Sequence, residues 1–337
     1  MVGLYVVSQA DGMGKTAVSA GIGRHLIDGG KRVGYFKPSL PGARGTAAND
    51  AGRDGEFLKS VLGLEEAPGD ISPTIVGNNG QAAGFSQALA NVSRDKDVVI
   101  VEVIGEPHQI AGLVSNGSDA KVIVVEGPVA GPSDGLAEAK RVFGDRLLGV
   151  IINKVPAMRL EEVRSRATAA FAGQSIAVLA VLPEDRWLLA LSVGELAERI
   201  QGEILNNPEK SGELADNIML GAMCVDAGPL YFGRQANKVA VLRGERADMQ
   251  MAALQTPTTC LILSGGREPV HQVRHQAEDK GVPIIVAAES VPEIVASIET
   301  ALANARFNQE EKVPRISQLL AEHFDFAALD RGLGATG

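Results

Sequence analysis

The sequence predicts an α/β protein in which a doubly wound, mostly parallel sheet carries a phosphate-binding loop and is followed by a second, smaller α/β domain. Short β-branched runs alternate with longer helical patterns, which is typical of βαβ units. The strand candidates are almost wholly apolar, as expected where helices cover both sheet faces. A glycine-rich turn ending in Gly14, Lys15 and Thr16 follows the first strand candidate.

The elements of the first domain follow from this alternation. Each strand candidate is a short aliphatic run, and each helix candidate is a longer segment between two such runs. Strands are expected at residues 4–8, 33–37, 98–103, 120–126, 148–153 and 176–182. Helices are expected at residues 15–29, 56–62, 84–93, 133–143, 160–172 and 193–200.

A polar stretch rich in turn-forming residues, 202–212, follows the last of these helices and is interpreted as an interdomain linker. We therefore expect a first domain over residues 1–205, a linker over 206–212 and a second domain over 213–330, with the boundary near Asn206. The second domain has strand candidates at 218–225, 238–242, 259–263 and 283–287, and helix candidates at 248–255, 269–280 and 291–306.

Composition narrows the function classes. A chain of 337 residues suits about two domains. A formal charge of -9 with only 4% aromatic residues disfavours nucleic acid as a partner, because nucleic-acid-binding proteins use positively charged surfaces and aromatic side chains that stack on bases.

The two cysteines, Cys224 and Cys260, lie in apolar surroundings without metal or redox spacing and are expected in the core. The first residues form a strand pattern rather than a signal peptide, and no apolar run suits a bilayer, so a cytoplasmic protein without membrane contact is expected.

The turn from Ser8 to Thr16 has the strand-to-helix context that a P-loop requires. Its glycines let backbone N–H groups converge on phosphate oxygens, and the helix N-terminus adds a positive dipole. Lys15 is expected to reach the terminal phosphates and Thr16 to present its hydroxyl to Mg²⁺. Gln9 departs from the usual pattern by replacing the first glycine, and an ordinary glycine-rich turn is the alternative. The expected nucleotide contacts in the loop are Asp11, Gly12, Met13, Gly14, Lys15 and Thr16.

This loop resembles that of dethiobiotin synthetases, in which the leading glycine sits one residue earlier, where Ser8 stands here. Resemblance to the partitioning and nitrogenase-type ATPases is weaker, since Ala10 replaces their signature lysine. Lys37 and Pro38 match the Lys-Pro that ends the second strand of the synthetases. The resemblance implies that Lys37 faces the substrate and the transferring phosphate, where an ammonium neutralises developing charge. The alternative is a solvated lysine at a strand end.

Two carboxylates are candidate Mg²⁺ ligands beside Thr16, because Mg²⁺ prefers hard oxygen ligands. Glu102 ends an apolar strand and matches the glutamate of the family's Val-Glu-Gly-Ala-Gly-Gly segment. Here Val103 and Ile104 replace the small residues that admit substrate, which puts the biotin-pathway substrate in doubt. Asp54 fits the second family carboxylate less securely. Asp50 is a rival, and a solvated loop acid remains open for either.

The resemblance also implies how the base is read. Asn153 ends the strand at which the family places an asparagine against adenine, and an amide offers both a donor and an acceptor. The alternative is an asparagine that finishes a strand and begins a turn.

The second domain is similar to the DRTGG domain over Val241–Leu254, Leu261–Gly266 and Gly281–Ile285. A synthetase-like P-loop domain followed by a DRTGG domain implies the phosphotransacetylase amino-terminal-like family, without the transacetylase domain and with a homodimer as the expected assembly. Arg243, Arg246 and Arg267 are candidates to meet an anion. The alternative is that these arginines belong to a solvated charged rim beside surface turns.

Two hypotheses for function remain. In the first, ATP and Mg²⁺ bind a regulatory or metabolic protein whose DRTGG-like domain transmits the nucleotide state or recruits a partner. In the second, an ATP-dependent ligase-like enzyme acts on a small carboxylate or carbamate, with Lys15 and Lys37 as catalytic residues. The bulky residues after Glu102, Val103 and Ile104, favour the first hypothesis. The presence of Lys37 favours the second.

Overall fold

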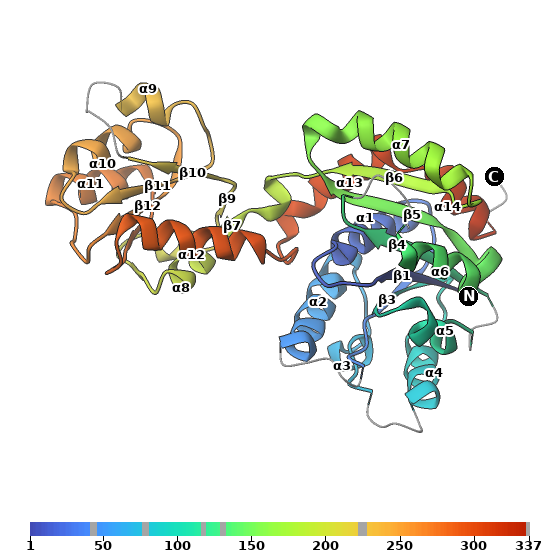
Figure 1. Cartoon of the computed structure of the whole chain (residues 1–337). Coiled ribbons are helices and arrows are strands. Elements are labelled where there is room, and N and C mark those ends of the chain that lie inside the picture. The colour runs from blue at the N-terminus through green and yellow to red at the C-terminus, as the bar shows by residue number, and fades with distance from the viewer. Residues whose placement is uncertain (41–45, 76–80, 116–118, 129–132, 222–227, 335–337) are drawn as a thin grey trace. The chain divides into compact units, whose positions relative to one another are not determined.

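The computed structural model describes the chain except residues 41–45, 76–80, 116–118, 129–132, 222–227 and 335–337, and leaves out the side chains of 46–50 and 81–83. The chain forms two compact units (Figure 1). Unit 1 combines Met1–Asp185 with Phe307–Gly337, and unit 2 is Arg186–Arg306. Among the described residues, none of the helices has both the length and the apolar composition needed to cross a membrane.

Unit 1 contains a parallel sheet of strand order β2-β3-β1-β4-β5-β6 within the described residues. The strands are β1 (Val2–Ser8), β2 (Val33–Phe36), β3 (Val98–Ile104), β4 (Ala120–Glu126), β5 (Leu147–Val155) and β6 (Val178–Pro183). Because every neighbouring pair runs parallel, the carboxyl ends meet at one edge, where ligands bind in open α/β sheets. In this register Ser8 of β1 lies beside Ile104 of β3.

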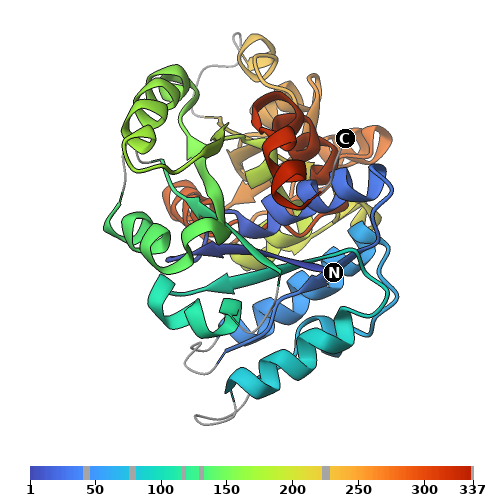
Figure 2. The same ribbon diagram turned by 90° about the vertical axis from the view of Figure 1, so that its right-hand side faces the viewer.

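Helices cover both faces of this sheet, as the apolar strands require (Figures 1 and 2). They are α1 (Lys15–Asp28), α2 (Thr46–Leu62), α3 (Pro68–Ile71), α4 (Gln81–Val92), α5 (Pro107–Ser115), α6 (Asp134–Phe143), α7 (Leu160–Ala172), α13 (Val313–His323) and α14 (Phe326–Gly332). On one face, Val101 and Val124 share a buried cluster with Leu136 of α6 and Phe171 of α7. The doubly wound, mostly parallel fold expected from the sequence is therefore confirmed.

The C-terminal helices return to unit 1, which the sequence did not indicate. Helix α13 lies against α1 (Figure 2), and Gly21 of α1 leaves room for Leu320, whose Cδ1 would lie 2.3 Å from an added Cβ. Phe324 forms an antiparallel bridge to Ala180 of β6. The expected extent of the second domain, to residue 330, therefore takes in a segment that packs in unit 1.

Unit 2 has its own mostly parallel sheet, ordered β10-β11-β12-β13-β8 in the described residues, with only β8 antiparallel to its neighbour. Its strands are β7 (Leu191–Ser192), β8 (Glu203–Ile204), β9 (Leu214–Ala215), β10 (Asn217–Leu220), β11 (Lys238–Arg243), β12 (Thr258–Ser264) and β13 (Ile284–Val286). Its helices are α8 (Val193–Arg199), α9 (Gly228–Phe232), α10 (Ala247–Leu254), α11 (His271–Lys280) and α12 (Val291–Ala303). Cys260 is a buried free thiol in this core, and Cys224 lies outside the described residues.

The stretch interpreted as a linker is part of unit 2. Ile204 pairs with Ile285, and the buried Asn206 side chain donates to the Val282 carbonyl at 3.0 Å and accepts from the Ile284 N–H at 2.8 Å. Turn-forming composition suggested a solvated linker, but this amide satisfies backbone groups of a neighbouring segment. The expected boundary near Asn206 therefore lies inside unit 2, and α8 belongs to unit 2 rather than to the first domain.

Candidate nucleotide-binding site

The glycine-rich turn joins β1 to α1 at the carboxyl edge of the sheet. Gly12 and Gly14 have φ values of 72° and 88°, in the left-handed region that favours glycine. A Cβ on Gly14 would also lie 2.3 Å from Asn153 Nδ2, so this position needs glycine for space as well. Asp11 is exposed and accepts from the Gly12 N–H at 2.9 Å. The geometry suits a phosphate-binding loop at a helix N-terminus.

Lys15 folds back along this loop. Its Nζ donates to Ser8 Oγ at 2.7 Å, and the side chain is 4% exposed. Burial lowers the pKa of Lys15 to about 8, although the Glu102 carboxylate opposes this effect. Ser8, which replaces the family's leading glycine, thus supplies the partner of the loop lysine.

Four side chains from four separate segments converge beside the loop. They are Thr16 at the start of α1, Lys37 after β2, Asp54 in α2 and Glu102 in β3. Lys37 Nζ lies 3.1 Å from Thr16 Oγ1 and 3.0 Å from Glu102 Oε2, and it also forms an ion pair with Asp54. Thr16 Oγ1 lies 3.1 Å from Glu102 Oε2 and 3.4 Å from Asp54 Oδ2. We call Thr16, Lys37, Asp54 and Glu102 the tetrad.

The tetrad has the donor set that Mg²⁺ uses. Three hard oxygens, from Thr16, Asp54 and Glu102, surround one cation, the Lys37 ammonium, which stands where a metal ion would find the same oxygens. Burial disfavours the charged forms of Glu102 and Lys37. Nearby opposite charges outweigh this effect: Lys37 and Lys15 lower the pKa of Glu102, and Glu102 and Asp54 raise the pKa of Lys37. The residues fit a magnesium ion that takes its other ligands from phosphate and water. The side chain of the rival Asp50 lies outside the described residues.

Asn153 lies against the loop. Its Nδ2 donates to the Met13 carbonyl at 2.9 Å, and its Oδ1 accepts from the Lys154 N–H at 2.9 Å. These bonds tie the end of β5 to the loop. Since an amide has two N–H donors and two acceptor lone pairs, one of each remains for a base.

Sequence reasoning missed Glu126, which ends β4 next to the loop strand. This carboxyl is 8% exposed, and its Oε1 accepts from Ser133 Oγ at 2.7 Å. Its Oε2 is buried and has no hydrogen-bond partner among the described residues, and burial raises its pKa. An acid at the end of an apolar strand, the signal that identified Glu102, also marks Glu126.

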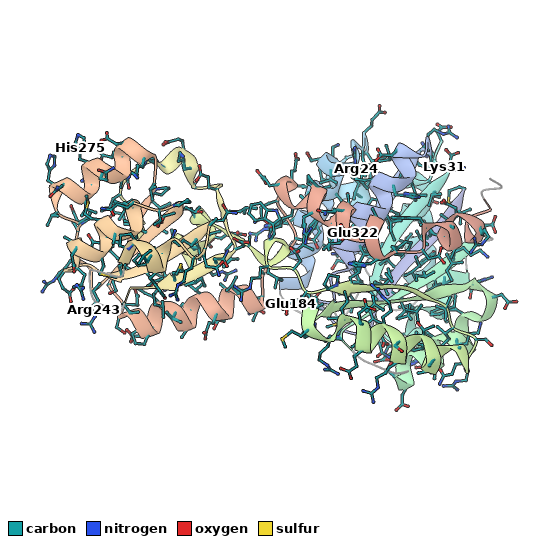
Figure 3. All side chains as sticks on the ribbon, turned by 90° about the horizontal axis from the view of Figure 1, so that it is seen from above. Arg24, Lys31, Glu184, Arg243, His275 and Glu322 are labelled. Carbon is teal, nitrogen blue, oxygen red and sulfur yellow. The ribbon has the colours of Figure 1, made fainter. Side chains whose placement is uncertain are left out.

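The carboxyl edge of unit 2 holds no comparable cluster within the described residues. Arg243 and Arg267 are exposed, and Arg246 is paired with Asp248, whose Oδ2 lies 2.8 Å from Arg246 Nη2. Arg243 and His275 project from the surface of this unit (Figure 3). Exposure and pairing of this kind are typical of a solvated charged rim, the alternative that the sequence left open.

Two known domain families match this chain. The AAA domain matches residues 2–190, and the DRTGG domain matches residues 195–301. A P-loop domain followed by a DRTGG domain is thus the organisation that the sequence motifs indicated.

Curated relatives cover both domains. Phosphate acetyltransferase of Haemophilus influenzae is 22% identical and covers 96% of this chain and 51% of the relative. Phosphate acetyltransferase of Nitrosomonas europaea is 24% identical and covers 95% of this chain and 50% of the relative. This chain spans about half the length of these relatives, and the predicted resemblance to phosphotransacetylases is confirmed.

Solved structures resemble parts of the chain. The CBS and DRTGG domains of Clostridium perfringens pyrophosphatase, complexed with the activator diadenosine tetraphosphate, are 15% identical with a TM-score of 0.30, covering 42% of this chain and 58% of that chain. Cell division protein FtsY of Thermotoga maritima is 18% identical with a TM-score of 0.36, covering 55% of this chain and 62% of that chain. MinD of Aquifex aeolicus is 18% identical with a TM-score of 0.36, covering 56% and 84%.

Proposed function

The chain belongs to the AAA domain family, and from this premise we propose that unit 1 binds ATP with Mg²⁺ in a nucleotide-dependent regulatory or metabolic protein related to the phosphotransacetylase amino-terminal region. The observation that carries this proposal is the convergence of Lys15 and the tetrad at the carboxyl edge of one parallel sheet. Buried titratable groups with shifted pKa values, gathered at one place, are typical of functional sites.

Each group has a role in this proposal. The backbone N–H groups of residues 11–16 cradle the phosphates, and Lys15 leaves Ser8 to meet the terminal phosphate. Thr16, Asp54 and Glu102 hold Mg²⁺, which neutralises phosphate charge when bound. Lys37 neutralises charge that develops on a transferring phosphoryl group.

Asn153 reads the adenine edge with its remaining donor and acceptor, while its first pair holds Met13. The DRTGG domain of unit 2 transmits the nucleotide state or recruits a partner. A small-molecule metabolite is the second ligand expected besides the nucleotide. In this proposal the protein is cytoplasmic and forms a homodimer. Light scattering on the purified chain tests for the homodimer.

The second candidate function is an ATP-dependent ligase-like reaction on a small carboxylate or carbamate through phosphoryl transfer. Lys37 favours it, because its ammonium lies in the tetrad and not in solvent. Ile104, which is 41% exposed at the end of β3, gives an acceptor less room than the family's glycines. Release of ADP and phosphate with a panel of small carboxylates and amines separates turnover from sensing.

The nucleotide site is tested by calorimetry with ATP and Mg²⁺. Lys15→Ala should weaken ATP binding by about tenfold or more, because a hydrogen bond to a charged group contributes about 1.5–3 kcal/mol. Lys31→Ala, at an exposed lysine beyond α1, is the control and should bind as the wild type does. Equal affinity in Lys15→Ala and wild type rejects the P-loop assignment.

A further inference from the structure

Lys37 is the cation around which the tetrad is built. Its Nζ contacts one oxygen from each of Thr16, Asp54 and Glu102, and the two acids are buried. Lys15 also affects Glu102 electrostatically, but its Nζ donates to Ser8 Oγ. Lys37 is therefore the direct partner of both carboxylates.

The same three oxygens cannot serve Lys37 and a divalent ion together. Mg²⁺ binds oxygen at about 2.0–2.1 Å, so an ion on these atoms would lie next to an ammonium that already contacts each of them. Two cations this close repel strongly in a buried site, where the effective dielectric constant is low. One of the two must leave.

We propose that Lys37 is a built-in counter-ion that keeps divalent metal out of the nucleotide-free site. Metal enters together with the nucleotide, whose phosphates give the Lys37 ammonium a new partner. The first statement needs only the tetrad, and the second rests on the proposed nucleotide function. Lys37 therefore sets the order of binding, in addition to any contact it makes with a transferring phosphate.

The test is direct titration of Mn²⁺, and then Mg²⁺, into the full chain without nucleotide, by calorimetry and by electron paramagnetic resonance of free Mn²⁺. Lys37→Met should bind one ion per chain at least about tenfold more tightly than wild type, a change of about 1.4 kcal/mol. The matched control is Lys96→Met, because Lys96 is buried to a similar extent, with a side-chain exposure of 17% against 15% for Lys37. Lys96 pairs with Glu66 at 2.8 Å, outside the tetrad, and its variant should match wild type.

Thermal unfolding gives a second measurement. Without metal, Lys37→Met leaves two buried carboxylates uncompensated and should melt lower than wild type. Adding Mg²⁺ should restore its melting temperature and leave the nucleotide-free wild type unchanged. A Lys37→Met chain that stays unfolded at every Mg²⁺ concentration counts against the proposal, because the metal then does not replace the ammonium.

Metal binding to nucleotide-free wild type as tight as to Lys37→Met overturns the proposal. Repeating the Mn²⁺ titration with ADP present tests the second statement, since wild type should then take up more of the ion than ADP alone does at the same concentration. If Lys37→Met gains the metal site but no variant binds nucleotide, the counter-ion role stands and the proposed function fails. If nucleotide binds but Lys37→Met gains nothing, the counter-ion role alone fails.

Discussion

Each unit buries a lysine at its sheet, and the two lysines have opposite surroundings. Lys37, at the carboxyl edge of unit 1, faces Asp54 and Glu102, and these carboxylates raise its pKa. Lys238 begins β11 at the amino edge of unit 2 and donates to the carbonyls of Gln235 and Pro257. Within the described residues no carboxylate pairs with Lys238, and burial lowers its pKa to about 8.

The difference separates a candidate binding site from a lysine that only satisfies backbone carbonyls. In unit 1, charges from four segments meet at the edge where parallel sheets bind ligands. In unit 2, a single ammonium caps loop carbonyls at the opposite edge, and the arginines of the carboxyl edge stay exposed or paired nearby. A change in the tetrad or loop of unit 1 should therefore alter binding, and a change at Lys238 of unit 2 should alter stability.

The largest effect is expected from removing residues 307–337. Helix α13 buries Ile316, Leu319 and Leu320 in unit 1. Each such side chain contributes about 1.5–3 kcal/mol, so their sum rivals the total stability of about 5–15 kcal/mol. We expect the shortened chain to lose cooperative unfolding of unit 1 and to lose ATP binding, measured by circular dichroism and calorimetry.

The matched variant replaces Arg186–Arg306 with a short glycine-serine linker. Asp185 Oδ2 lies 2.8 Å from Arg315 Nε, so the residue before the replaced segment contacts helix α13. The linker is made long enough to run from Asp185 to Phe307 within unit 1. This variant should fold and bind ATP. Normal ATP binding by the chain that lacks 307–337 would show that unit 1 does not need its returning helices.

Gly14→Ala should have the next largest effect. A left-handed alanine costs about 1–2 kcal/mol, and its Cβ would displace Asn153 from the loop. ATP affinity should fall about tenfold, which corresponds to about 1.4 kcal/mol. Gly30→Ala is the control, because Gly30 has a φ of 79° with no atom within 4 Å of an added Cβ. If both variants bind ATP alike, the loop does not depend on this contact.

The buried Lys238 should make the free energy of unfolding of unit 2 depend on pH. Its folded pKa, about 8, lies below the ordinary 10.5, so between these values the unfolded chain holds a proton that the folded chain does not. The free energy of unfolding of unit 2 should therefore rise with pH over this window, and this group contributes no slope below about pH 8. Hydrogen exchange of β11 amides in wild type and Lys238→Met measures the difference. Parallel pH profiles would contradict the assignment.

The smallest effect is expected at Asn153. Asn153→Ala leaves the Met13 carbonyl without its side-chain donor, which costs about 1 kcal/mol and lowers the affinity for all nucleotides several-fold. If Asn153 also reads adenine, the preference for ATP over GTP should fall as well. Competition binding distinguishes these outcomes, because an unchanged ratio leaves Asn153 with loop positioning alone. Asn206→Ala in unit 2 should lower stability without changing ATP affinity.

The sequence predicted most of the candidate site because strand ends are readable from one chain. Lys37 and Glu102 each follow or end an apolar run, and parallel strands bring such positions to one edge. Asp54 has no strand-end signal, because it lies within helix α2, whose position relative to Thr16 depends on packing. Glu126 carried the same strand-end signal as Glu102 but matched no family motif.

The sequence by itself determined the alternation of strands and helices, the glycine turn and the order of the P-loop and DRTGG regions. These features are local, since they follow from side-chain periodicity and from the φ angles that Gly12 and Gly14 permit. Only the tertiary structure decided that residues 307–337 join unit 1, that Asn206 is buried in unit 2, and that one lysine holds both acids of the tetrad. Those outcomes depend on contacts between segments far apart in the chain, which local pattern does not encode.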